Sequence, residues 1–155
     1  MLFFCEGLGF PRDPMRMVGT RNMWINAGRQ QFHMPRGEAI PFPGEVGVSV
    51  KDIKRVHRNM KRIACELKGT EFSIKEVGKT LTCTSPWGHV LRVHQAGQLS
   101  GRMPQAISYV NFWVPVGTAK TIADFYEKMV YAPTEVAKRG KHAMAVVTVG
   151  ANQHF

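Results

Sequence analysis

The sequence predicts an α+β fold in which short strands surround two amphipathic helices. Apolar residues recur at helical spacing in two segments, and strand-like segments that alternate polar and apolar residues lie between and around them. In addition, the start of the chain resembles its end at one constant offset. These observations are typical of a small domain made of repeated helix–strand units.

Length and composition indicate the broad class of protein. The 155 residues are 44% hydrophobic and 21% charged, which suits one soluble globular domain. No segment reaches the roughly 20 apolar residues that a membrane-spanning helix needs. Cys5, Cys65 and Cys83 are odd in number and lack CxxC spacing, which favours a reducing, intracellular compartment. The formal net charge of +10 favours an anionic partner or simple solubility and does not identify a fold.

The first helix is predicted over residues 49–67. Apolar residues follow one another at steps of three and four positions and form a single stripe. Ser49 is expected to cap the start of the helix, with the Asp52 carboxylate near the positive end of the helix dipole. The stripe consists of Ile53, Val56, Met60, Ile63 and Leu67.

The second helix is predicted over residues 118–131. Its apolar face includes Ile122, Phe125 and Met129, and Pro133 is expected to end it. Glycine and proline separate the strand-like segments around both helices. These segments are 22–27, 30–34, 46–50, 71–75, 80–84, 90–94, 109–114 and 143–149.

The two ends of the chain resemble each other at an offset of 122 residues (125 minus 3). Residues 3–33 align with residues 125–155 without a gap, so that Phe3-Phe4 falls on Phe125-Tyr126. Each copy reads as the end of a helix, a loop, a strand, a tight turn and another strand. The first copy is expected to begin in mid-helix, and the second to lack the final strand of its unit.

Three segments resemble motifs of the glyoxalase/bleomycin-resistance/extradiol-dioxygenase group, the vicinal oxygen chelate superfamily. Phe3-Phe4-Cys5-Glu6-Gly7-Leu8-Gly9-Phe10 is similar to its helix end Phe-Tyr-x-x-x-Leu-Gly-Phe. Residues 85–93 stand where the last strand of a family module often begins Asp-Pro-Asp-Gly-Asn, and residues 45–48 stand where its first strand begins. The resemblance implies βαβββ modules that form a cupped, mainly antiparallel sheet flanked by helices, with a small-molecule site inside the cup.

The resemblance covers nearly the whole chain as one domain of three modules. Residues 1–37 are expected to form a partial module, residues 44–96 a complete one, and residues 107–155 a module that lacks its last strand. Incomplete modules leave strand edges unpaired, and such edges favour pairing with another chain.

The resemblance also implies a divalent metal, bound by His and Glu side chains on the first and last strands of paired modules, which stabilises negative charge on a substrate. The corresponding positions hold Glu45, Arg92 and Tyr109 here. Arg92 is cationic and cannot bind a metal, whereas His94 lies two residues further on the same strand face and could act beside Glu45. The expectation is a centre for manganese, iron, zinc or nickel that is degraded or is completed by another chain.

Four side chains are expected to line the cup. Arg92 could hold a ligand carboxylate or phosphate by a bidentate hydrogen bond, while His94 could equally be a strand-end histidine bonded to backbone or water. His33 and His154 lie one residue apart in the repeat register, so opposite faces are expected and equivalent ligand roles are not. No triad or phosphate-loop pattern identifies catalytic residues. The expected cup residues are Glu45, Arg92, His94 and Tyr109.

The first predicted helix carries six basic residues within twelve positions and could meet a polyanion. Nucleic acid is the weaker alternative because no aromatic residues are interleaved for stacking on bases. An acidic protein partner and a homodimer stay open. The basic residues are Lys51, Lys54, Arg55, Arg58, Lys61 and Arg62.

Two functions follow from these observations. The leading interpretation is a glyoxalase- or dioxygenase-like protein that binds a small molecule in the cup, with metal-dependent lyase, isomerase or dioxygenase activity left open. The alternative is a non-catalytic structural or accessory subunit that binds a protein partner through its basic surface and open sheet edges.

Overall fold

The computed structural model describes residues 1–15, 22–99, 101 and 103–155. Helical segments and short strands alternate along these residues in the order η1, β1–β3, α1, β4–β7, α2, β8–β10. The helical segments are η1 (Leu2–Gly7, a π-helical turn), α1 (Ile53–Ile63) and α2 (Ala119–Val130). The strands are β1 (Asn22–Ala27), β2 (Gln30–Pro35), β3 (Gly44–Val50), β4 (Ser73–Val77), β5 (Thr80–Thr84), β6 (Val90–Gln95), β7 (Ala106–Phe112), β8 (Thr134–Arg139), β9 (His142–Gly150) and β10 (Gln153–His154).

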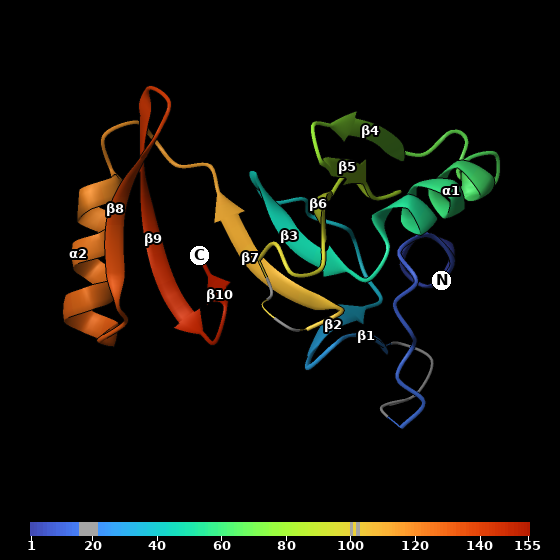
Figure 1. Cartoon of the computed structure of the whole chain (residues 1–155), viewed down its shortest axis with the longest axis horizontal. Coiled ribbons are helices and arrows are strands. Elements are labelled where there is room, and N and C mark those ends of the chain that lie inside the picture. The colour runs from blue at the N-terminus through green and yellow to red at the C-terminus, as the bar shows by residue number, and fades with distance from the viewer. Residues whose placement is uncertain (16–21, 100, 102) are drawn as a thin grey trace.

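Eight strands form one sheet in the order β4-β5-β6-β3-β7-β10-β9-β8, and β1 and β2 form a separate hairpin. The central strands β3 and β7 are antiparallel, and each is parallel to its other neighbour, β6 or β10. On either side of the β3–β7 pair the strands therefore follow the order first, last, third and second of a βαβββ unit. The predicted α+β fold is confirmed, with α1 and η1 beside one half of the sheet and α2 beside the other (Figure 1).

The main core lies between α1, η1 and one face of the β3–β6 half of the sheet. Strand alternation decides which side chains enter it, because every second residue of a strand points to the same face. The α1 stripe packs onto these residues with Val56, Met60 and Ile63 buried. The buried strand residues of this core include Val48, Val50, Leu81, Cys83, Leu91 and Val93.

The first predicted helix is shorter than residues 49–67. Ser49 does not cap it but lies on β3, fully buried, with its Oγ 3.0 Å from Oγ of Ser108. The cap is Asp52, whose carboxylate accepts a hydrogen bond from the Arg55 backbone N–H at 2.9 Å. Beyond Ile63 the chain continues in turns with i to i−3 hydrogen bonds, so it stays coiled to about Thr70 without remaining α-helical.

The segment 134–139 is not among the strands predicted from the sequence. Its residues are mainly polar, and most of them are exposed in the structure. Its pairing with β9 supplies the order that its own sequence lacks. The expected absence of a last strand in residues 107–155 needs one amendment. Gln153 and His154 form β10, which pairs in parallel with β7 through His154 and Tyr109.

The resemblance between the two chain ends recurs in their hydrogen bonds. The N–H of Phe10 donates to Phe4 O at 3.0 Å, and 122 residues later the N–H of Ala132 donates to Tyr126 O at 3.2 Å. A second backbone pair recurs in the same way, from Asn26 to Pro11 and from Thr148 to Pro133. The same offset relates the bridge between Arg12 and Ile25 to the pairing of Thr134 with Val147. The repeat is therefore structural as well as sequential.

No helix among the described residues is long and apolar enough to cross a membrane.

Candidate functional site

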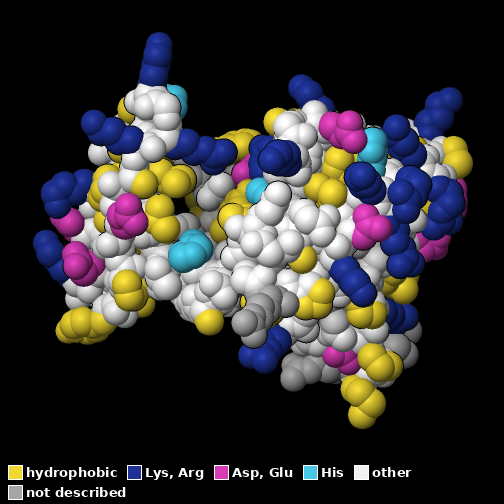
Figure 2. Space-filling view, viewed as in Figure 1, with side chains coloured by type: hydrophobic (Ala, Val, Ile, Leu, Met, Phe, Trp, Pro, Cys, Tyr) yellow, Lys and Arg dark blue, Asp and Glu magenta, His cyan; other side chains and the backbone are white. Residues whose placement is uncertain are grey.

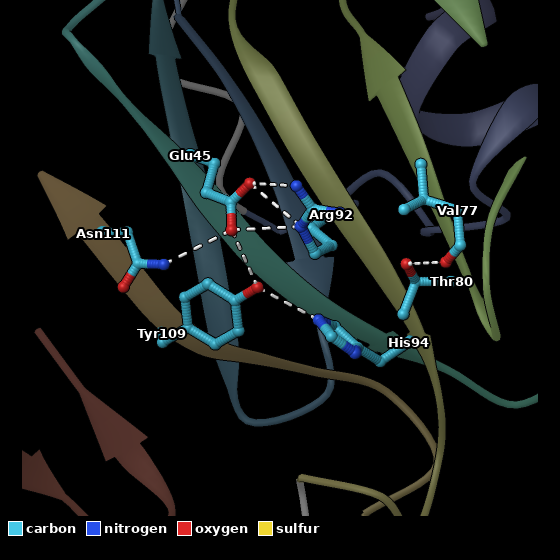
Figure 3. A network of polar contacts seen from close by, with 7 residues as sticks. All are labelled: Glu45, Val77, Thr80, Arg92, His94, Tyr109 and Asn111. Carbon is cyan, nitrogen blue, oxygen red and sulfur yellow. Dashed lines mark hydrogen bonds and ion pairs between the residues drawn. The ribbon is translucent and has the colours of Figure 1, made fainter. Parts of the chain in front are cut away.

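Polar side chains meet on the face of the sheet opposite α1, at the centre of the strand order. Val46 and Val48 point from β3 toward the core side, so Glu45 between the strand start and Val46 points to the other face. The same alternation puts Arg92 and His94 of β6 on that face, since Leu91 and Val93 are core residues. Figure 3 shows how these side chains converge with Tyr109 and Asn111 of the neighbouring β7.

Glu45 is the centre of the network. It is 5% exposed and accepts hydrogen bonds from Arg92 through Nε, at 3.1 and 3.0 Å, and through Nη2, at 2.8 Å. Tyr109 Oη donates at 3.2 Å and Asn111 Nδ2 at 3.3 Å. Burial opposes ionisation of Glu45, but the Arg92 guanidinium and the other donors outweigh it and hold the pKa of Glu45 below its usual value.

Tyr109 links Glu45 to His94. The hydroxyl has one proton, and since it donates that proton to Glu45, it must accept from His94 Nε2 at 3.1 Å. Burial, together with the nearby Arg92 cation, lowers the pKa of His94, which favours the neutral ring. A neutral His94 with its proton on Nε2 has an unprotonated Nδ1, so the ring offers an acceptor beyond the network.

The Tyr109 ring lies directly over Gly47. A Cβ on Gly47 would overlap the ring at Cε1, Cζ and Cδ1, so the absence of a side chain is what lets the ring lie against β3. Burial, reinforced by the charge of Glu45, raises the pKa of the Tyr109 phenol well above its usual range. The hydroxyl is therefore a neutral hydrogen-bonding group at physiological pH.

A cavity of about 500 Å³ lies in front of this network, between the two halves of the sheet. Polar and apolar side chains from both halves of the sheet line it, and no Asp or Glu is among its described lining residues. Arg139 of β8 reaches this side of the sheet, and its charge acts on Tyr109. The lining residues are Val77, Thr80, Arg92, His94, Leu99, Tyr109, Asn111, Arg139, Met144, Val146, His154 and Phe155.

The structure brings all four expected cup residues together, although Glu45 lies beneath the cavity instead of on its lining. Four polar lining residues were not foreseen, namely Thr80, Asn111, Arg139 and His154. Asn111 follows Tyr109 by two positions on the same strand, so strand alternation alone could have indicated it. Arg139 and His154 could not be found this way, because they depend on β8 and β10.

The expected metal ligands do not fit a metal. Four donor atoms already meet the roughly four lone-pair positions of the Glu45 carboxylate. His94 Nε2 is turned to Tyr109, so a metal at Glu45 would have to displace the Arg92 guanidinium. Among the described residues no group of three or more His, Cys, Asp or Glu could hold an ion.

The pKa shifts of His94 and Glu45 predict that acid destabilises the fold. His94 takes up its proton less readily in the folded state than at its ordinary pKa of 6.5, so its contribution is present above pH 6.5 and is lost below it. The pKa of Glu45 is also lowered in the folded state, so the stability that its ionised form contributes is lost as the pH falls below its ordinary pKa of 4.5. Denaturant unfolding across this range should show two falls in the free energy of unfolding, and His94→Gln should remove only the first. An unchanged profile in His94→Gln would contradict the assignment.

Comparison with solved structures finds proteins with a similar fold. One of them is a Bacillus subtilis subsp. subtilis str. 168 protein described as a "putative dioxygenase". The match covers 97% of this chain and 55% of that protein's chain, with a TM-score of 0.58 and 10% sequence identity. The chain thus spans about half the length of that protein. A Bacillus cereus protein described as a possible glyoxalase matches 59% of this chain and 82% of its own, with a TM-score of 0.42 and 15% identity.

Sequence comparison adds no closer assignment, since no protein-family model and no curated protein matches the chain. The likeness to the Bacillus subtilis protein, at 10% identity, concerns the fold alone. This chain therefore shares a fold with that protein, and its strand order is the arrangement of βαβββ units that the sequence resemblance implies.

Proposed function

We propose that the chain binds a small organic anion in the cavity between β6, β7 and β9, without a metal held by its own residues. The observation that carries this proposal is the charge of the lining: Arg139 supplies a guanidinium, and no carboxylate is among the described lining residues. The one carboxylate nearby, Glu45, is already paired with Arg92. A ligand anion would therefore find positive charge that is not opposed at the cavity surface.

The ligand class follows from the polar and apolar side chains that line the cavity. Arg139, His154 and Asn111 offer nitrogen donors for a carboxylate or phosphate. The Nε–Nη2 edge of Arg92 faces Glu45, so a ligand carboxylate or phosphate would use the remaining Nη1–Nη2 edge for a bidentate hydrogen bond. The rest of the lining is apolar and suits an aromatic or aliphatic body. It is formed by Val77, Leu99, Met144, Val146 and Phe155.

The polar network supplies one further group that a ligand can meet. His94 offers an unprotonated Nδ1, held in place by the chain of hydrogen bonds from Nε2 through Tyr109 to Glu45. This group can accept a hydrogen bond or a proton from the ligand. Binding is the function that the geometry supports; a reaction would begin with this nitrogen.

The proposal is tested with three probes of similar size: benzoate, phenyl phosphate and benzyl alcohol. Titration calorimetry should show binding of the two anions and at least about tenfold weaker binding of the alcohol, corresponding to about 1.4 kcal/mol. Arg139→Glu should reduce anion binding. The matched control is Lys141→Glu, an equal charge change on an exposed residue two positions away that does not line the cavity.

Either of two results would reject the proposal. Equal binding of the alcohol and the anions would show that charge is not recognised. Equal losses in Arg139→Glu and Lys141→Glu would show that only the net charge of the protein matters, and not the cavity.

A further inference from the structure

The outer face of α2 is apolar and uncovered. Phe125 is 54% exposed and Met129 is 69% exposed, although both lie within a regular helix. The inner face of the same helix is already used, because Ala119 and Ala123 are buried. Two large apolar side chains one turn apart, both open to solvent, are unusual for a helix that has no further contact.

The internal repeat shows how the same chain treats the equivalent surface at its other end. Phe3 and Phe4 of η1 precede Phe125 and Tyr126 by 122 residues, and the rings of each pair pack edge to face, with centroids 5.1 and 5.4 Å apart. Phe3 is only 2% exposed, however, against 54% for Phe125. The two aromatic pairs correspond, but Phe3 is covered and Phe125 is not.

What covers the first copy is a neighbouring unit. The ring of Phe3 packs on Phe72, with centroids 6.2 Å apart, and η1 lies against α1. Gly7 faces Met60 and Ile63 of α1 so closely that an added Cβ would lie 2.7 Å from Met60 Sδ. The repeat equivalent of Gly7 is Met129 (7 plus 122), which is exposed. The equivalents of both Phe3 and Gly7 are therefore exposed in the second copy.

We propose that α2 packs against α2 of a second copy of this chain, about a twofold axis that passes close to Phe125 and Met129. A second copy offers the uncovered apolar face of its own α2 for this contact, whereas its α1 is already in contact with η1. Such an interface is self-complementary, as a twofold dimer requires. The Phe125 and Met129 side chains of both copies would form its centre.

Charge favours α2 over α1 for this contact. Residues 119–130 carry Lys120 and Lys128 against Asp124 and Glu127, so the helix has no net formal charge. Residues 51–62 carry six cations and one carboxylate, a net of +5. Figure 2 shows Lys and Arg gathered over the α1 end, while the α2 end mixes both signs with apolar side chains. In a chain of net charge +10, α2 is the helix that can approach its own copy without repulsion.

The oligomeric state tests this proposal. Light scattering coupled to size-exclusion chromatography should show a dimer at micromolar concentration, and Phe125→Asp and Met129→Lys should each give a folded monomer. Ile40→Asp is the matched control, since Ile40 is also apolar and 79% exposed but lies in a loop far along the chain. This variant should remain dimeric. A monomeric wild type, or a dimer that survives both α2 substitutions, would overturn the proposal.

Cross-linking tests the position of the axis. In a Cys65→Ser background, which removes the exposed native thiol, Met129→Cys should form an intermolecular disulfide under mild oxidation. Ile40→Cys in the same background should not. A dimer in which only Ile40→Cys cross-links, or in which Met129→Cys stays reduced, would place the interface elsewhere and reject α2 pairing.

Discussion

Replacing Arg92 with alanine is expected to lower the free energy of unfolding by about 3–5 kcal/mol, because it leaves the buried Glu45 carboxylate without its cation. The side chain of Glu45 is 7% exposed and takes three contacts from the guanidinium. Without these contacts the effect of burial, which raises the pKa of Glu45, is less strongly opposed, so this pKa should rise. Denaturant unfolding gives the first quantity, and carbon NMR of the labelled carboxyl gives the second.

The control separates the unpaired charge from the loss of side-chain packing. Adding Glu45→Gln to Arg92→Ala removes the carboxylate, so the double variant should be more stable than Arg92→Ala alone. Arg62→Ala breaks an exposed pair with Glu6, at 3.5 Å, and should cost no more than about 1 kcal/mol. If Arg92→Ala costs as little as Arg62→Ala, the Glu45–Arg92 pair is not the structural centre of the site.

Replacing Gly47 with alanine is expected to displace the Tyr109 ring and to cost about 1–3 kcal/mol, as forced overpacking does. Backbone conformation is not the cause, since the added Cβ would overlap the ring itself. The shift should break the contacts of Tyr109 with Glu45 and His94, and near-ultraviolet circular dichroism and His94 ring NMR shifts should report it. Binding of phenyl phosphate should fall in parallel, because Tyr109 lines the cavity.

Gly37→Ala is the matched control for this prediction, since an added Cβ there meets no atom within 4 Å. This variant should be neutral, or more stable by up to about 1 kcal/mol because the unfolded chain loses freedom. The double variant Gly47→Ala/Tyr109→Leu should lose less stability than the sum of the single variants, since it removes the ring that clashes. Strict additivity would contradict the overlap.

The sequence predicted the elements that carry strong local signals. The stripe of α1 and the alternating strands around Leu81 and Leu91 fold as expected, because 3.6- and 2-residue periods determine which face is buried. The segment α2 is a helix as predicted, but it leaves Phe125 and Met129 of its predicted apolar face exposed. The offset of 122 residues was also visible in the sequence, and equivalent hydrogen bonds now accompany it. Local signals failed at Ser49, which had the composition of a cap but was needed in the buried strand β3.

The sequence also indicated the four residues at the centre of the site, through strand positions implied by the family resemblance. What it could not indicate was how they pair. Glu45 was a candidate metal ligand until its position beside Arg92 showed that its lone pairs are already taken. That contact joins residues 47 positions apart, and only the parallel pairing of β3 with β6 brings them together.

The sequence by itself determined the class of fold, the repeated unit and the strand faces, since each depends on periodic burial along a short stretch of chain. The tertiary structure alone decided the network around Glu45, the lining of the cavity by Arg139 and His154, and the difference in exposure between Phe3 and Phe125. These features depend on which distant segments become neighbours, and a local pattern of residues does not predict such long-range contacts.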